Sequence, residues 1–114
     1  MPRALPTVRI LGIAPGSRVT GYGIIESDGV RSTYVSSGCI RAADLEFPAR
    51  LKTIFDGVAE VVGEFAPDEI AIEQVFVSKS VQSALKLGQA RGAALAAALA
   101  RSLSVSEYAP NAIK

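Results

Sequence analysis

The sequence predicts an α/β domain built on a mixed five-stranded sheet. Three short runs with apolar residues come first and are separated only by tight turns, as in antiparallel strands. Two helical segments then alternate with two further short strands, and helical crossovers of this kind join parallel strands. We therefore expect strands one to three to be antiparallel and strands one, four and five to be parallel.

The leading strands are expected over residues 8–13, 20–26 and 31–41. The first is apolar and rich in β-branched side chains, which favours a buried central strand. A turn broken by Pro15 and Gly16 ends this strand and brings backbone N–H groups close to whatever lies above it. Asp28-Gly29 is a strong hairpin signal between the second and third strands.

The first helix is expected to begin near Pro48, which suits a first helical turn, and to stop at Pro67-Asp68. Its apolar residues recur at helical spacing, with charged residues on the other face. A short strand from Glu69 to Glu73 follows. Ser80 is a candidate N-cap for a second helix that runs to about residue 101, before a last strand over residues 104–109.

Composition limits the possible functions of the chain. Its 114 residues fit one domain over residues 1–114, and the net charge of +1 means that any DNA affinity comes from a local patch. The absence of histidine leaves carboxylates as the plausible metal ligands. A single cysteine, Cys39, fits a reducing cytosol and is expected to be a small apolar filler. The longest apolar run, residues 93–100, is too short for a bilayer, so we expect a cytoplasmic protein without a membrane partner.

Two strand ends could carry chemistry, namely Ala14 at the end of strand one and Glu73 at the end of strand four. If these strands are neighbours, both positions face one crevice, because ligands bind at the carboxyl ends of parallel strands. A carboxylate there could hold a hard cation. Spacing alone slightly favours the simpler interpretation of Glu73 as a solvated strand-end residue.

The second helix carries small residues every fourth position, at Ala84, Gly88, Gly92 and Ala96. Each glycine inside a helix costs roughly 1 kcal/mol against alanine, which suggests that another element approaches closely. Tight packing on the chain's own sheet and contact between two copies are equally compatible with the pattern. Beside this helix, Phe76 reads either as a core residue or as an aromatic that engages a base. Three basic residues read either as a phosphate-facing set or as a solvated helix face: Lys79, Lys86 and Arg91.

Three blocks of the sequence resemble the RuvC family of bacterial Holliday-junction resolvases. Residues 10–23 read ILGIAPGSRVTGYG, against the family pattern LGIDPGSRxTGYG, and residues 37–41 read SGCIR. The third and most specific block spans residues 72–92 and contains EQVF followed by SALKLGQARG. The three blocks come in order with matching intervals, and the likeness runs across almost the whole of residues 8–114.

The resemblance implies a ribonuclease-H-like fold and a homodimer that nicks four-way DNA junctions symmetrically during recombination and repair. It implies Mg²⁺ or Mn²⁺, two ions per complete site, held by four carboxylates of which the first two match Ala14 and Glu73. It further implies that Phe76 binds the junction, that Lys114 lies near the scissile phosphate, and that the long second helix packs across the dimer axis. The branch-migration helicase complex is the implied protein partner.

The chain departs from the family pattern at Ala14, where the family has aspartate. The remaining two family carboxylates would follow Lys114, on a helix that covers one face of the sheet. We therefore expect this chain to be catalytically inactive as written, with that sheet face exposed.

Alternative interpretations remain open at this point. One is a non-catalytic module that binds branched DNA. Another is an ATPase or sugar kinase of related fold that uses Gly16 to Gly21 as a phosphate loop, although no second phosphate-binding glycine motif follows. A ribosomal-RNA-processing nuclease of the same superfamily is a minor option.

Overall fold

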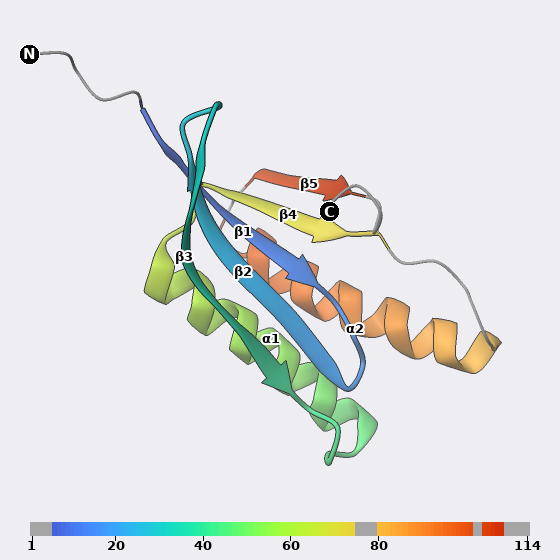
Figure 1. The fold of residues 1–114 in the computed structure, drawn as a ribbon. Coiled ribbons are helices and arrows are strands. Elements are labelled where there is room, and N and C mark those ends of the chain that lie inside the picture. Colours follow the sequence, from blue (N-terminus) through green and yellow to red (C-terminus); the bar gives the residue numbers. More distant parts are fainter. Residues whose placement is uncertain (1–5, 75–79, 102–103, 109–114) are drawn as a thin grey trace, which may run out of the picture.

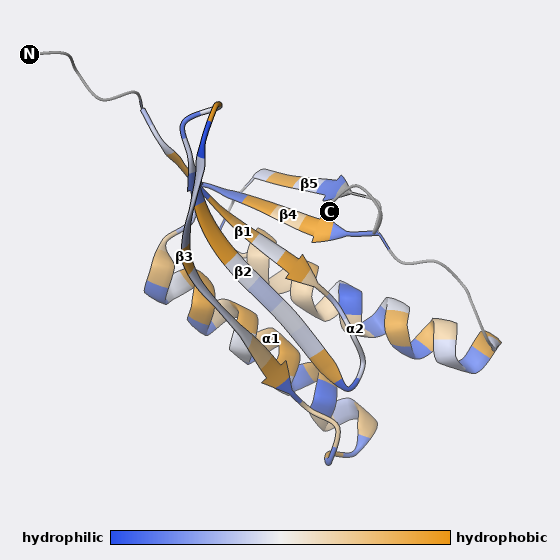
Figure 2. Ribbon diagram, in the orientation of Figure 1, coloured by the Kyte–Doolittle hydropathy of each residue, from blue (hydrophilic) through white to orange (hydrophobic). Residues whose placement is uncertain are grey.

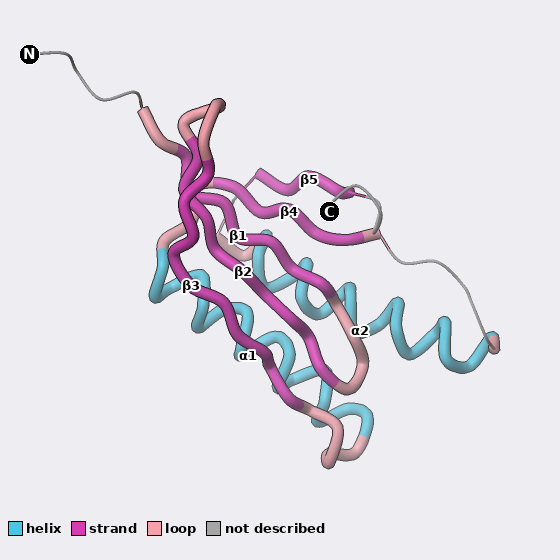
Figure 3. Tube along the Cα trace, viewed as in Figure 1, coloured by secondary structure: helices cyan, strands magenta, loops and turns pink. Residues whose placement is uncertain are grey.

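The computed structural model describes residues 6–74, 80–101 and 104–108. The elements follow the predicted order, and Figures 1 and 3 show a twisted sheet with two helices packed on one face. Their bounds are β1 (Val8–Ala14), β2 (Val19–Ser27), β3 (Ser32–Arg41), α1 (Phe47–Phe65), β4 (Glu69–Glu73), α2 (Val81–Leu99) and β5 (Ser104–Tyr108).

The sheet has the strand order β3-β2-β1-β4-β5. The pairs β1–β2 and β2–β3 are antiparallel, whereas β1–β4 and β4–β5 are parallel, which confirms the predicted mixed sheet. The β2–β3 register shifts between Ile24 and Ile25, a bulge that the sequence did not signal. Gly29 occupies the hairpin turn with φ +92°, as the Asp28-Gly29 signal predicts.

Both helices cover the same face of the sheet (Figure 1). The hydropathy colouring shows apolar segments along β1, β2 and β4, whose alternate side chains enter the core (Figure 2). Leu11, Ile13 and Ile72 are among the most buried side chains. Helix α2 contributes only alanines to the fully buried set, which lets it pack close to its neighbours: Ala90, Ala94, Ala97 and Ala98.

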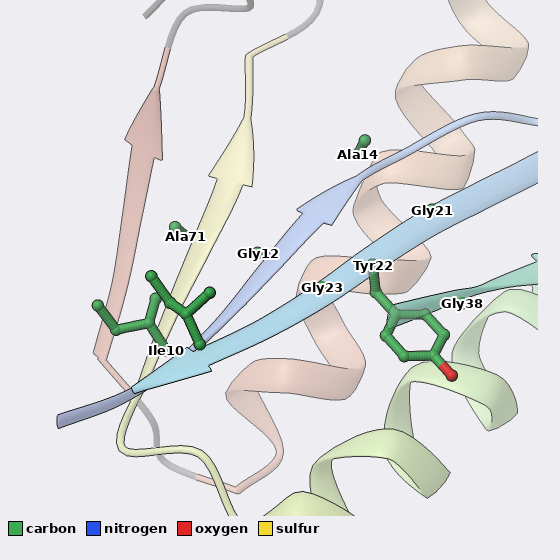
Figure 4. Close-up of a pocket in the computed structure, with 9 residues that line it drawn as sticks. Ile10, Gly12, Ala14, Gly21, Tyr22, Gly23, Gly38 and Ala71 are labelled. Atoms are coloured by element: carbon green, nitrogen blue, oxygen red, sulfur yellow. The ribbon is translucent and has the colours of Figure 1, made fainter. Parts of the chain in front are cut away.

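The opposite face of the sheet has no covering element among the described residues. Small and apolar residues line a shallow trough of about 550 Å³ there, including Gly12 and Gly23 on the two central strands (Figure 4). Within the parts of the chain that the structure describes, this face of the sheet is therefore exposed.

Local signals set the helix ends. Pro48 lies in the first turn of α1, and Ala66 closes the helix in the left-handed region, with its N–H donating to the Val62 carbonyl at 3.0 Å. Ser80 is confirmed as the N-cap of α2, because its Oγ accepts from the Ser83 amide at 3.1 Å.

Two further expectations concern single features. The prediction of Cys39 as an apolar filler is wrong, because this residue is exposed on β3, where its side chain alternates away from the helix-packed Ile40. No described helix combines the length and apolarity needed to cross a bilayer.

The hairpin turn should respond to acid through Asp28. Its Oδ1 accepts from the amides of Arg31 and Val30, both at 2.8 Å, and these bonds hold the pKa of the carboxyl below its usual value of 3.8. The stabilisation is complete above the unfolded pKa and is lost as the pH falls through the lower folded value. An NMR titration of the Asp28 carboxyl carbon should show the lowered pKa, and Asp28→Asn should remove this pH dependence. A midpoint at or above 3.8 would contradict the expectation.

Candidate functional site

The carboxyl ends of β1 and β4 lie side by side in the centre of the sheet. The two strands are parallel, and Ile13 and Ile72 are the last residues paired in their register. One step further along each strand are Ala14 and Glu73, which therefore occupy adjacent register positions. The structure thus brings together the two strand ends that the sequence singled out.

Ala14 and Glu73 also share a face of the sheet. Ile13 and Ile72 are fully buried against the helices, so the next residue on each strand faces the opposite side. Ala14 is exposed, Glu73 is half-buried, and Figure 4 shows Ala14 on the same face as Ala71. The two strand ends thus place one carboxylate and one methyl group next to each other on the open face of the sheet.

The turn after Ala14 is fixed by a reciprocal pair of hydrogen bonds. Thr20 Oγ1 donates to the Gly16 carbonyl at 3.0 Å and accepts from the Gly16 amide at 3.3 Å, and the Thr20 side chain is buried. A Cβ at Gly16 would lie 2.3 Å from the Val19 carbonyl oxygen, so this approach requires glycine. Sequence reasoning found the turn and missed Thr20, because the hydrophobic pattern does not report a side-chain contact with backbone.

The described residues at this site do not by themselves fit a metal ion. Alanine has no donor atom, which leaves Glu73 as the single carboxylate of the pair. Over the described part of the chain, no group of three or more His, Cys, Asp or Glu side chains is placed to hold a metal. Divalent cations such as Mg²⁺ take several oxygen ligands, so one carboxylate falls short of a binding site.

Several predicted contact residues fall elsewhere. Phe76, Lys114 and Lys79 lie outside the described residues. Lys86 Nζ lies 5.8 Å from the centre of the Phe47 ring, and Arg91 forms an ion pair with Glu107 on β5. Both basic residues thus have partners within the chain, which weakens their interpretation as a free phosphate-facing set.

The small-residue pattern of α2 faces away from the core. Gly88 and Gly92 are exposed, and a Cβ added at either would meet nothing within 4 Å. Packing on the chain's own sheet is therefore not the reason for these glycines, and that alternative is wrong. Leu85 beside them is 63% exposed.

Comparison with known proteins decides the family. The family model described as Crossover junction endodeoxyribonuclease RuvC matches residues 10–114. The chain belongs to the RuvC family. Curated RuvC proteins from Vibrio cholerae and Shewanella pealeana are 59% and 57% identical to it over 105 residues, which is 92% of this chain and 61% of each relative. The chain thus spans less than two thirds of the length of these relatives.

The fold agrees with the assignment to the RuvC family. The structure titled T. thermophilus RuvC in complex with Holliday junction substrate matches with a TM-score of 0.81 and 26% identity, over 91% of this chain and 66% of that one. The mixed sheet with its two helices is thus the ribonuclease-H-like arrangement expected for RuvC proteins.

Replacing Thr20 with valine should loosen the turn that carries position 14. The substitution keeps the shape of the side chain but removes the hydroxyl that pairs with the Gly16 amide and the Gly16 carbonyl. Leaving these two partly buried groups without a partner should lower the free energy of unfolding by about 1–3 kcal/mol. Urea denaturation measures this cost. Thr53→Val on α1 is the matched control, because the Thr53 side chain makes no hydrogen bond with the described residues, and it should change stability far less. Equal effects of the two substitutions would contradict the role of Thr20.

Proposed function

We propose that this chain is a RuvC-type subunit that recognises four-way DNA junctions and does not cut them while alanine stands at position 14. The observation that carries the proposal is that Ala14 and Glu73 directly follow the paired residues Ile13 and Ile72 at the ends of β1 and β4, beside a turn that Thr20 holds. Membership of the RuvC family supports the substrate class, as does the likeness to a protein solved with a Holliday junction.

The proposed ancestral activity is metal-dependent endonuclease cleavage, which nicks a junction symmetrically in recombination and repair. Mg²⁺ or Mn²⁺, two ions per complete site, is the proposed cofactor, and Glu73 is the one ligand that the described residues provide. Because a single carboxylate does not hold a catalytic divalent cation, we assign no hydrolytic step to this chain.

The remaining site residues of the proposal are Phe76 and Lys114. Phe76 is proposed to stack against an unpaired base at the crossover, and Lys114 to offset the charge of a phosphate near the cut. A cytoplasmic location and contact with a branch-migration helicase complex complete the proposal.

A homodimer through α2 is proposed from the exposed surface of that helix. Gly88 and Gly92 lie on it without any described neighbour, and Val81 and Leu99 are 75% and 51% exposed. Two helix glycines cost roughly 2 kcal/mol in propensity, which a close helix–helix approach would offset. The exposed apolar side chains would be buried in the same contact.

The alternative functions differ in what they require of the same turn. A non-catalytic module for branched DNA has the same activity as the proposed subunit and differs only in lacking an endonuclease ancestry, so the methyl group at position 14 fits both. A phosphate loop from Gly16 to Gly21 is disfavoured, because Gly21 lies within β2 and pairs with Ala14. A loop that cradles phosphate would instead need its amides free of the sheet.

The junction-binding proposal predicts selectivity without cleavage. The chain should bind a synthetic four-way junction more tightly than a linear duplex of equal length, and affinity should fall as salt rises. With Mg²⁺ present, the junction strands should remain intact. Mobility-shift assays measure the binding, and denaturing gels of end-labelled strands measure cleavage. Nicked strands, or equal affinity for both DNAs, would refute the proposal.

The dimer proposal predicts sensitivity to bulk at Gly88. Gly88→Leu places a large side chain where two helices are proposed to meet, and should weaken self-association about tenfold or more. Sedimentation velocity over a series of protein concentrations measures the strength of self-association. Gln82→Leu, an exposed position about 120° around the same helix from Gly88, serves as the control and should leave association unchanged. A monomeric parent chain, or equal effects of both changes, would count against α2 as the interface.

A further inference from the structure

Strand β3 forms an outer edge of the described sheet. It pairs with β2 on one side and stands last in the strand order. Its residues Ser37, Cys39 and Arg41 are exposed. An edge strand presents backbone N–H and C=O groups that can pair with a further strand.

A groove of about 450 Å³ runs between this edge and α1. Gly57 of α1 lies against Ile40, since a Cβ at Gly57 would come within 2.9 Å of the Ile40 side chain, and this contact brings the helix close to the strand. The Tyr22 ring extends across Gly38 and lines the same groove, because a Cβ at Gly38 would lie 2.6 Å from the Tyr22 hydroxyl (Figure 4). The Tyr22 hydroxyl has no hydrogen-bond partner among the described residues.

Carboxylates line the helical wall of the groove. Asp56, Glu60 and Glu64 recur every fourth residue and are exposed, so they form one row along α1. Asp56 pairs with Lys52 at 2.6 Å, whereas Glu60 and Glu64 have no ion pair within the described chain. Arg41 is the one cation among the described residues that line the groove, and the three carboxylates outnumber it, so the groove disfavours phosphate and hence DNA.

We propose that the β3–α1 groove binds an extended basic segment of a partner protein, which adds to β3 as a sixth strand. Backbone pairing would run along residues 36–41, beyond the bulge in the β2–β3 register. Successive side chains of a strand point to opposite faces, so every second one would reach toward α1. Lysine or arginine at those positions would meet Glu60 and Glu64, and could also donate to the Tyr22 hydroxyl.

Charge also argues against a second copy of this chain in the groove. If two copies paired along their β3 edges, related by a two-fold axis perpendicular to the sheet, both α1 helices would lie on the same face of the joined sheet. The two rows of carboxylates would then approach each other, and like charges disfavour that contact. A basic partner removes this repulsion. The inference goes beyond the DNA-binding proposal, because it uses neither Ala14 nor the DNA-contact residues.

The test uses a fluorescent peptide of alternating lysine and threonine, with a glutamate–threonine peptide as its charge-reversed match. The parent chain should bind only the basic peptide. Glu60→Gln combined with Glu64→Gln should weaken binding about fivefold, the scale expected for two exposed ion pairs. The control pair Asp44→Asn and Glu46→Gln removes the same charge from exposed positions in the β3–α1 connection and should leave affinity unchanged.

Amide hydrogen exchange then locates the bound peptide. Basic peptide should slow exchange in residues 36–41, while salt should weaken binding. Equal weakening by both double variants would reduce the effect to overall charge and overturn the proposal. Slower amide exchange only outside residues 36–41 would also overturn the proposal. So would slower exchange of β3 at high protein concentration without peptide, because that result would identify a second copy of the chain as the occupant.

Discussion

The parallel pairing of β1 with β4 is the constraint on which the site depends. It requires the chain to leave β3, cross over through α1 and return in the same direction, so that two strands far apart in sequence end together. Ile13 and Ile72 anchor the pair by their complete burial under the helices. The residues that follow them are thereby fixed on the open face, whatever their chemistry. The scaffold of the site is thus set by packing rather than by the functional side chains.

Because packing and not the functional side chains sets the scaffold, position 14 can lack a metal-donor group while the surrounding structure stays intact. The turn after Ala14 is held by the Thr20–Gly16 hydrogen bonds, neither of which involves the side chain at position 14. Ala14 is exposed, so an acidic side chain there would meet no steric obstacle from the core. A methyl group at this position therefore removes a ligand without any requirement for the fold to rearrange.

The sequence predicted the elements whose signals are local. The bounds of β4, the Asp28-Gly29 hairpin and the Ser80 cap follow from neighbouring residues, and the structure confirms them. The placement of side chains relative to other helices and strands was harder to predict from the sequence. The exposure of Gly88 depends on how α2 is rotated, and the buried alanines of that helix have the same hydropathy as the exposed Ala96. Thr20 was missed because its role comes from a contact with backbone, which periodicity does not report.

The central claim is that position 14 and Glu73 form one ligand pair, and Mn²⁺ binding tests it most directly. Electron paramagnetic resonance would follow free Mn²⁺ during titration of the parent chain, of Ala14→Asp, and of Ala14→Asp combined with Glu73→Gln. A second carboxylate adds a hard oxygen ligand, so Ala14→Asp should bind Mn²⁺ more tightly than the parent, and the added Glu73→Gln should abolish that gain. Equal binding by the parent and Ala14→Asp, or a gain that survives Glu73→Gln, would contradict the account.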